Sequence, residues 1–319
     1  MKIGVSSCLL GNPCRYDGKG SNDKFVINTL SKYCEYVPYC PEAEIFPTPR
    51  DTIRLVERDG DNFKAVIPAQ EYKDVSSEMS DIASKLVNSI NEGEICGFIL
   101  KSKSPSCGLE RVKVYQNDTS SMHEKKGIGF FAKALKEKFP YLPIEEEGRL
   151  MDPWLKENFL LQIFAYDDLF KFLKKVQSFK ELVEFHTSYK YLIYAKSQSS
   201  YKELGNIVAN HDKNSLEDVL VKYKDGFLKA IAHKDSINKT YNVLLHILGY
   251  FKKKITAEEK EVMLESCQEY KDGIIPLIAV IKLINIYVKR FDDTYLKTQK
   301  FLSPYPSELA LRSDLKAYK

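Results

Sequence analysis

The chain has 319 residues, about twice the length of a typical domain, which predicts two domains and excludes a single small module. Hydrophobic residues make up 44% of it and charged residues 29%, a composition that excludes a disordered chain. The formal net charge is +4, and Lys282 interrupts the longest apolar run, at 274–284. We therefore expect no membrane association, and since the N-terminus lacks the apolar length of a secretory signal we expect a cytoplasmic protein.

The first half of the chain alternates between segments with strand and helix patterns. In chain order we expect a strand at 2–10, a helix at 25–33, a strand at 35–39, a hairpin of strands at 52–57 and 62–67 around a turn at 58–61, a helix at 75–90, a strand at 95–101, a helix at 129–139 and a strand from 142. This alternation predicts an α/β, Rossmann-like doubly wound sheet into which the hairpin is inserted.

The pattern changes near Asp152, which precedes a proline as at the start of many helices. Beyond it strand signals are few and apolar residues recur at helical spacing, so we expect domains at 1–148 and 152–319, the second an all-α helical domain. From residue 151 onward there are 27 Lys and Arg against 22 Asp and Glu. A charged solvated surface accounts for this excess, which also permits an anionic partner such as RNA.

The cysteines concentrate near the N-terminus, where six of the seven lie before residue 108. Cys8 follows the first predicted strand, Cys40 the second, and Cys107 lies in the loop after the strand at 95–101. The carboxyl ends of parallel strands meet at one edge of a sheet, so we expect these three sulfurs to converge there. For Cys8 the alternative is a small core residue. No role is predicted for Cys34, Cys96 or Cys267. Cys14 is considered with the motifs below.

The spacing of the cysteines argues against structural zinc, because the Cys-x-x-Cys pairs of zinc ribbons are absent. Three thiolates on a [4Fe-4S] cluster would leave one iron without a protein ligand. Such an open position would let the metal act as a Lewis acid. A structural metal without turnover is the alternative.

Four separated motifs resemble the thiouracil desulfurase (TudS) family: SSCLLGNPCRYDG at 6–18, CPEAEIFPTPR at 40–50, KSKSPSCG at 101–108 and GIGFFA at 127–132. The second half resembles the YbgA-type domain through FHTSYK at 185–190, YKELG at 201–205, HILGYFK at 246–252 and YPSELALR at 305–312. Together the two halves resemble the RudS-type desulfidases.

This resemblance implies an oxygen-sensitive [4Fe-4S] cluster on Cys8, Cys40 and Cys107, with Cys14 of the first motif as the rival ligand. The implied substrates are thiolated pyrimidines or their nucleotides, whose sulfur binds the open iron while water attacks the carbon. Sulfur then leaves as hydrosulfide. The resemblance favours Ser102 as catalytic, and the helical domain is implied to bind RNA, including thiolated tRNA.

Several polar residues in these motifs are candidates for the chemistry. Glu42, two residues from a cysteine, is the expected general base, and the alternative is a salt bridge with Arg50. Ser104, like Ser102, could orient water or the pyrimidine, or else cap a turn. Three cations could bind a substrate phosphate or counter cluster charge, or simply be solvated, namely Arg15, Arg50 and Lys101.

Two of the motifs also predict local backbone structure. No glycine occurs between Glu42 and Pro47, whereas relatives often have one, so we expect a differently shaped loop there. GIGFFA lacks the third glycine of a dinucleotide-binding turn and predicts a close contact between a helix and the sheet. The rival function for the whole chain is an RNA-binding adaptor that recognises thiolated tRNA and carries a structural metal.

Overall fold

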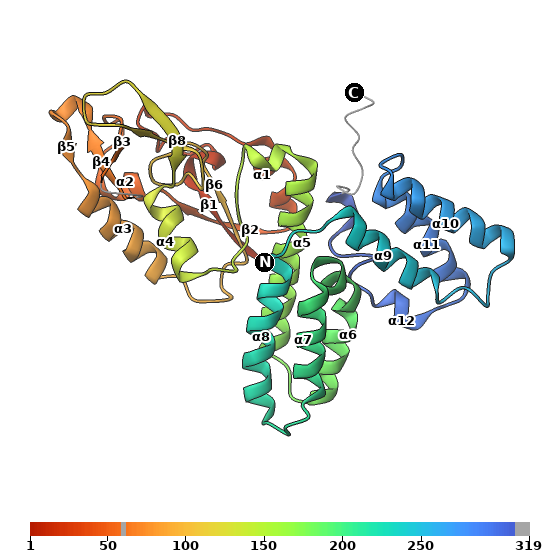
Figure 1. Cartoon of the computed structure of the whole chain (residues 1–319). Helices are drawn as coiled ribbons and strands as arrows, with labels where there is room; N and C mark the ends of the chain where they lie inside the picture. Colours follow the sequence, from red (N-terminus) through yellow and green to blue (C-terminus); the bar gives the residue numbers. More distant parts are fainter. Residues whose placement is uncertain (59–61, 310–319) are drawn as a thin grey trace. The chain divides into compact units, whose positions relative to one another are not determined.

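The computed structural model describes residues 1–58 and 62–309. The chain divides into two compact units, Met1–Leu155 and Lys156–Lys319 (Figure 1). Two predicted features lie partly outside the description: the turn at 58–61, of which residues 59–61 are not described, and the last motif, of which residues 310–312 are not described.

A four-stranded parallel sheet lies in the first unit. Its strands are β1 (Lys2–Ser6), β2 (Glu35–Tyr39), β6 (Phe98–Leu100) and β9 (Ile144–Glu146), in the order β2-β1-β6-β9. All three neighbouring pairs are parallel, so the four carboxyl ends share one edge. The chain leaves β1 for β2 on one side and returns to β6 on the other. In an open α/β sheet, such a change of direction opens a crevice for ligands.

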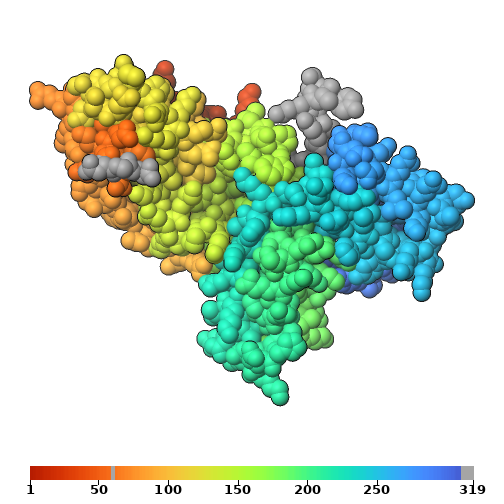
Figure 2. Space-filling model, in the orientation of Figure 1, coloured from red at the N-terminus to blue at the C-terminus, as the bar shows by residue number. Residues whose placement is uncertain are grey.

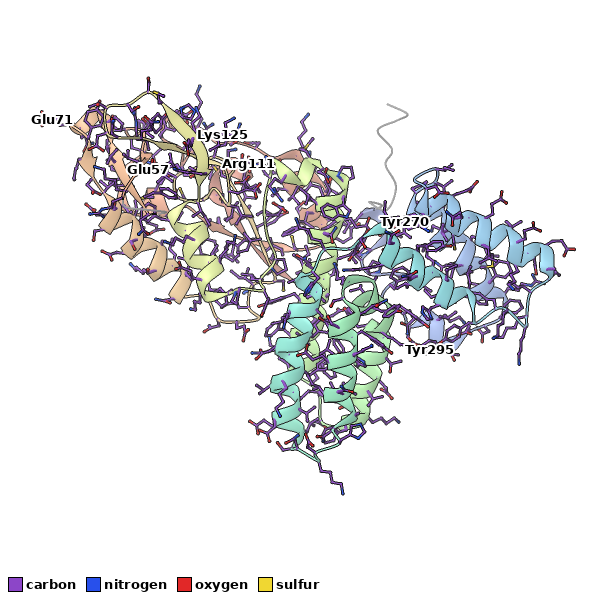
Figure 3. All side chains as sticks on the ribbon, viewed as in Figure 1. Glu57, Glu71, Arg111, Lys125, Tyr270 and Tyr295 are labelled. Carbon is purple, nitrogen blue, oxygen red and sulfur yellow. The ribbon has the colours of Figure 1, made fainter. Side chains whose placement is uncertain are left out.

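A second sheet of five strands lies in the same unit, in the order β5-β4-β3-β7-β8. Its strands are β3 (Arg54–Glu57), β4 (Phe63–Ile67), β5 (Lys73–Asp74), β7 (Val112–Tyr115) and β8 (His123–Gly127). The predicted hairpin is present as the antiparallel pair β3 and β4. Strand β8 was not predicted because its sequence, HEKKG, has no apolar alternation. It is an edge strand whose charged side chains, such as Lys125, lie exposed (Figure 3).

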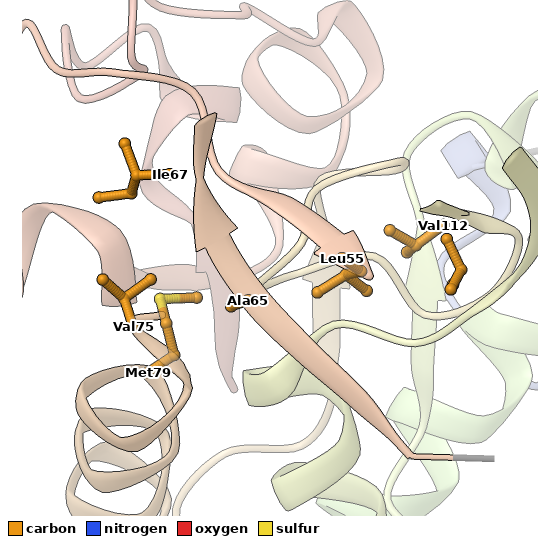
Figure 4. Close-up of a cluster of buried hydrophobic side chains, with 7 residues drawn as sticks. Leu55, Ala65, Ile67, Val75, Met79 and Val112 are labelled. Atoms are coloured by element: carbon orange, nitrogen blue, oxygen red, sulfur yellow. The ribbon is translucent and has the colours of Figure 1, made fainter. Parts of the chain in front are cut away.

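The core of the second sheet packs against helix α3 (Ser76–Asn88) (Figure 4). Met79 on this helix and Val75 just before it are fully buried with Leu55, Ala65 and other apolar side chains of the sheet. Burying each large side chain contributes about 1.5–3 kcal/mol, so this cluster fixes the second sheet to its helix.

The remaining helices of the first unit are α1 (Lys24–Asn28), α2 (Pro41–Ile45) and α4 (Phe130–Lys138). The helix predicted at 25–33 is shorter than expected and is followed by a 3₁₀ turn, Leu30–Lys32. Helix α2 occupies the stretch without glycine, which is therefore helical rather than a loop.

The described part of the second unit is helical throughout. Its helices are α5 (Pro153–Leu173, which begins just before the division), α6 (Phe179–Lys196), α7 (Gln198–Ala209), α8 (Leu216–Ala232), α9 (Ile237–Leu248), α10 (Ala257–Lys271), α11 (Leu277–Arg290) and α12 (Thr294–Lys297). Side-chain oxygens cap several helix starts, as Ser178 and Thr256 do within capping boxes. In Figure 2, α6 to α8 and α10 to α11 form the green and blue ends of this unit.

Among the described residues, none of the helices combines the length and apolar character needed to cross a bilayer.

Candidate active site

A cavity of about 370 Å³ lies at the carboxyl edge of the parallel sheet. Every residue predicted for the site lines it: Cys8, Arg15, Cys40, Glu42, Arg50, Lys101, Ser102, Ser104 and Cys107. The rival ligand Cys14 lines it as well. The structure thus brings together all of the candidates that the sequence scattered over a hundred residues.

Each of the three cysteines enters the cavity from a different strand end. Cys8 lies in the 3₁₀ turn Ser7–Leu10 directly after β1, and Cys40 is the residue between β2 and α2. Cys107 lies in the loop that follows β6. Cys8 and Cys107 are buried, so Cys8 combines the burial expected of a core residue with a place on the cavity wall.

Burial disfavours the ionised form of these thiols. It raises the pKa of Cys8 and of Cys40 to about 12, with neighbouring Cys14 adding to the effect in both cases. Burial raises the pKa of Cys107 as well, and the charges of Glu42, Cys40 and Cys8 add to it. Three thiolates at this place would therefore need positive charge from a bound group, which a metal centre provides.

Glu42 is held in place from both sides of its carboxylate. Its Oε2 accepts a hydrogen bond from Arg50 Nη2 at 2.7 Å, and its Oε1 accepts from the hydroxyls of Ser104, at 3.2 Å, and of Ser106. The salt bridge with Arg50, the alternative considered from the sequence, is thus present. Pairing does not remove Glu42 from the site, because its side chain also lines the cavity.

Arg50 and Ser104 also make hydrogen bonds with backbone groups of the site. Arg50 Nη1 donates to the carbonyl oxygen of Cys14 at 3.0 Å, which ties the first motif to the second. Its Nε is buried and has no partner among the described residues. Ser104 Oγ accepts from the backbone N–H groups of Ser106 and Cys107, both at 3.2 Å, so it caps the turn that holds Cys107.

Lys101 and Ser102 share a partner that sequence reasoning missed. The carboxylate of Glu147 accepts from Lys101 Nζ and from both the hydroxyl and the backbone N–H of Ser102. The register of β6 with β9 pairs Leu100 with Glu146, which places residue 147 beside residue 101. The only sequence signal for this contact was the strand predicted from residue 142, and that prediction did not specify the register with β6.

Arg15 is the least engaged of the three predicted cations. Its guanidinium lies 3.8 Å from Asp17 and its side chain is 33% exposed, so it is accessible to a ligand. The cavity residues that were not predicted as site residues include Ser106, Tyr16, Tyr39 and Thr52. Ser106 is buried inside the serine-rich motif, where the alternation of serines was the available signal.

The family model of the 2-thiouracil desulfurases matches residues 3–147. Protein YbbK of Bacillus subtilis is 33% identical over 138 residues, covering 42% of this chain and 88% of that protein. The chain belongs to the 2-thiouracil desulfurase family. The unit that carries the cavity is therefore an enzyme domain.

A second family model matches the other half of the chain. A model of proteins of unknown function, DUF1722, matches residues 190–306. Protein YbgA of Escherichia coli is 28% identical over 157 residues, covering 49% of this chain and 93% of that protein. A solved structure, the [4Fe-4S]-dependent thiouracil desulfidase TudS, is 29% identical, with a TM-score of 0.37, and covers 47% of this chain and 93% of that one.

The donor set of the cavity is made of cysteine thiols. Among the described residues no three Cys, His, Asp or Glu side chains are close enough to hold one metal ion. Three cysteine thiols that line one cavity fit an iron–sulfur cluster, because such clusters are held by cysteine thiolates.

Proposed function

We propose that the first unit is an iron–sulfur-dependent desulfurase that converts thiolated uracil compounds, such as thiouracil or thio-UMP, to their oxygen counterparts. The reaction releases sulfide and involves no net electron transfer. One observation carries the proposal: three strand-end thiols and the Glu42 carboxylate line the same cavity in a chain of the 2-thiouracil desulfurase family.

The proposed cofactor is a [4Fe-4S] cluster held by Cys8, Cys40 and Cys107. When bound, it supplies an iron without a protein ligand, a Lewis acid that draws electron density from a thiocarbonyl. Cys14 lines the same cavity and is the rival ligand. Its carbonyl oxygen is fixed by Arg50, which supports a role for this residue in shaping the first motif.

The remaining steps belong to this chain's own residues. Glu42 is positioned to take a proton from the attacking water, and Arg50 with the serine hydroxyls holds its carboxylate in one orientation. The water oxygen bonds to the carbon, the carbon–sulfur bond breaks, and the sulfur leaves as hydrosulfide. The two protons of water thus end on hydrosulfide and in solvent, which balances the hydrolysis.

Arg15 provides the proposed contact for a substrate phosphate. Its partly exposed guanidinium lines the cavity and lies 3.8 Å from Asp17, whereas Arg50 and Lys101 make closer ion pairs with carboxylates. Ser104 acts by holding Glu42 and the Cys107 turn, and Ser102 contacts the pyrimidine.

Three finer points extend the proposal. The parallel sheet is Rossmann-like, which its strand order and central crevice support. The protein is cytoplasmic, which the seven free cysteines support. The helical unit brings thiolated tRNA to the site, which the excess of 27 basic over 22 acidic residues from residue 151 onward supports.

The test is an anaerobic assay of the reconstituted full chain against 2-thiouracil, 4-thiouracil and their nucleotides. We expect loss of the thione absorbance with one sulfide released for each substrate consumed. A reconstituted protein that leaves all four compounds intact would overturn the proposal. Nucleotides that react more slowly than free bases would contradict the role of Arg15.

A further inference from the structure

The acidic run Glu145 to Glu147 frames the loop that carries Ser102 and Cys107. At one end of this loop, Glu146 Oε1 accepts from the backbone N–H of Leu109 at 2.8 Å. At the other end, Glu147 bonds the residues that follow β6. The run that marks the end of the first domain in the sequence thus also holds the loop that lines the cavity.

Glu147 makes the more specific set of contacts. Its Oε2 accepts from the backbone N–H of Ser102 at 2.7 Å. Its Oε1 accepts from Ser102 Oγ at 2.8 Å and from Lys101 Nζ. The side chain is only 12% exposed and is not among the residues that line the cavity, so Glu147 contacts Ser102 from outside the cavity.

This arrangement fixes the direction of the Ser102 hydroxyl. A serine hydroxyl has one proton, and here that proton is donated to Glu147. A carboxylate can only accept hydrogen bonds, so the direction cannot reverse while Glu147 is ionised. Ser102 therefore presents only lone pairs, one of which faces Lys101 Nζ at 3.4 Å, so in the cavity it can accept a hydrogen bond but cannot donate one.

We propose that Glu147 is a positioning residue that makes Ser102 an acceptor, so that the site selects pyrimidines with a ring N–H beside the sulfur-bearing carbon. This inference rests on the proposed function. The ring of 4-thiouracil has such an N–H at N3, next to C4. An N3-methyl group removes this donor and leaves Ser102 Oγ with only the 3.4 Å hydrogen bond from Lys101 Nζ, which costs affinity.

Glu147→Gln tests the inference because it keeps the size of the side chain and changes its hydrogen bonding. The amide must turn its oxygen to the fixed N–H of Ser102, since two donors cannot face each other at that distance. Its NH₂ group then replaces Oε1, so it donates to Ser102 Oγ, and Lys101 Nζ loses its carboxylate acceptor. The hydroxyl rotates, and Ser102 becomes a donor toward the cavity.

The primary measurement is the dissociation constant of unreactive ligands, uracil and 3-methyluracil, for the cluster-loaded full chain by calorimetry. We expect the wild type to bind uracil about tenfold more tightly than 3-methyluracil, and Glu147→Gln to bring this ratio close to one. Glu147→Asp, which keeps the carboxylate, should retain part of the preference. Glu145→Gln is the matched control, because Glu145 belongs to the same run but bonds Arg149 instead.

The outcomes separate this inference from the proposed function. A ratio that stays the same in Glu147→Gln would overturn the inference, since steric exclusion of the methyl group would not depend on residue 147. The ratio of the turnover rate of 4-thiouracil to that of N3-methyl-4-thiouracil should change among the variants as the binding ratio does. The iron content of the variants should not change. If the binding ratios behave as expected but no thione is consumed, the proposed function fails and the selection by Glu147 stands.

Discussion

At the scale of single residues, Glu42 is the group on which proton transfer depends. We expect Glu42→Gln to lower kcat for thiouracil by about 100-fold or more, because an amide cannot take the proton of the attacking water. The iron content should not change, since Glu42 is not a proposed ligand. Glu44→Gln on the same short helix is the control, because Glu44 is exposed and does not line the cavity. Equal losses in both variants would remove Glu42 from the mechanism.

His186 makes the second unit sensitive to acid. Burial lowers its pKa to about 4, and the nearby charge of Lys190 adds to the effect. The unfolded chain, with an ordinary histidine pKa near 6.5, then binds more protons than the folded chain between pH 4 and 6.5. Stability attributable to this group is therefore complete above pH 6.5 and falls as the pH drops, by up to about 3 kcal/mol.

Urea unfolding of the helical signal at pH 7 and at pH 4.5 measures this loss. Glu and Asp residues also titrate in this range, so the variant His186→Gln isolates the histidine. The variant should lose less stability than the wild type on acidification, while His246→Gln, at an exposed histidine, should behave as the wild type does. A wild-type loss that His186→Gln does not reduce would contradict the assignment.

At the scale of elements, the start of helix α4 fixes the loop that carries Cys107. The N–H of Phe131 donates to the carbonyl of Ser106 at 2.9 Å, and the N–H of Gly129 donates to that of Gly108 at 2.8 Å. A Cβ on Gly129 would lie 2.4 Å from the backbone carbonyl of Ser106. The glycine motif predicted a close contact between a helix and the sheet, but at Gly129 the structure makes the contact between the start of the helix and this loop, and only glycine permits it.

Gly129→Ala should displace this loop. We expect a loss of about 1–3 kcal/mol in the stability of the first unit and a lower iron content, because Cys107 moves with the backbone. Thermal unfolding and iron analysis measure the two effects. Gly205→Ala is the control, since a Cβ there meets nothing within 4 Å. Full iron occupancy in Gly129→Ala would show that the loop tolerates the shift.

Elements also show what sequence alone can predict. Cys8, Cys40 and Cys107 could be placed together, because apolar runs mark the strands and parallel strands share a carboxyl edge. The contact of Glu147 with Ser102 could not, because it depends on the register between β6 and β9, which tertiary packing sets. The edge strand β8 escaped prediction since an exposed edge needs no apolar face.

At the scale of the whole molecule, the site belongs to the first unit. The residues that line the cavity all lie between Ser6 and Cys107. A chain ending at Leu155 should therefore consume free thiouracil with kcat within about threefold of the full chain, a difference of less than 1 kcal/mol in activation energy. Loss of activity with an intact cluster would mean that the helical unit contributes to catalysis.

The most direct test of the account is the iron content of serine variants after anaerobic reconstitution. Cys8→Ser, Cys40→Ser and Cys107→Ser should each lose the cluster together with thiouracil turnover, whereas Cys14→Ser should retain it. Cys34→Ser, at a cysteine of the same unit that does not line the cavity, is the control. Full cluster content in any of the first three variants, or its loss in Cys14→Ser, would contradict the proposed ligand set.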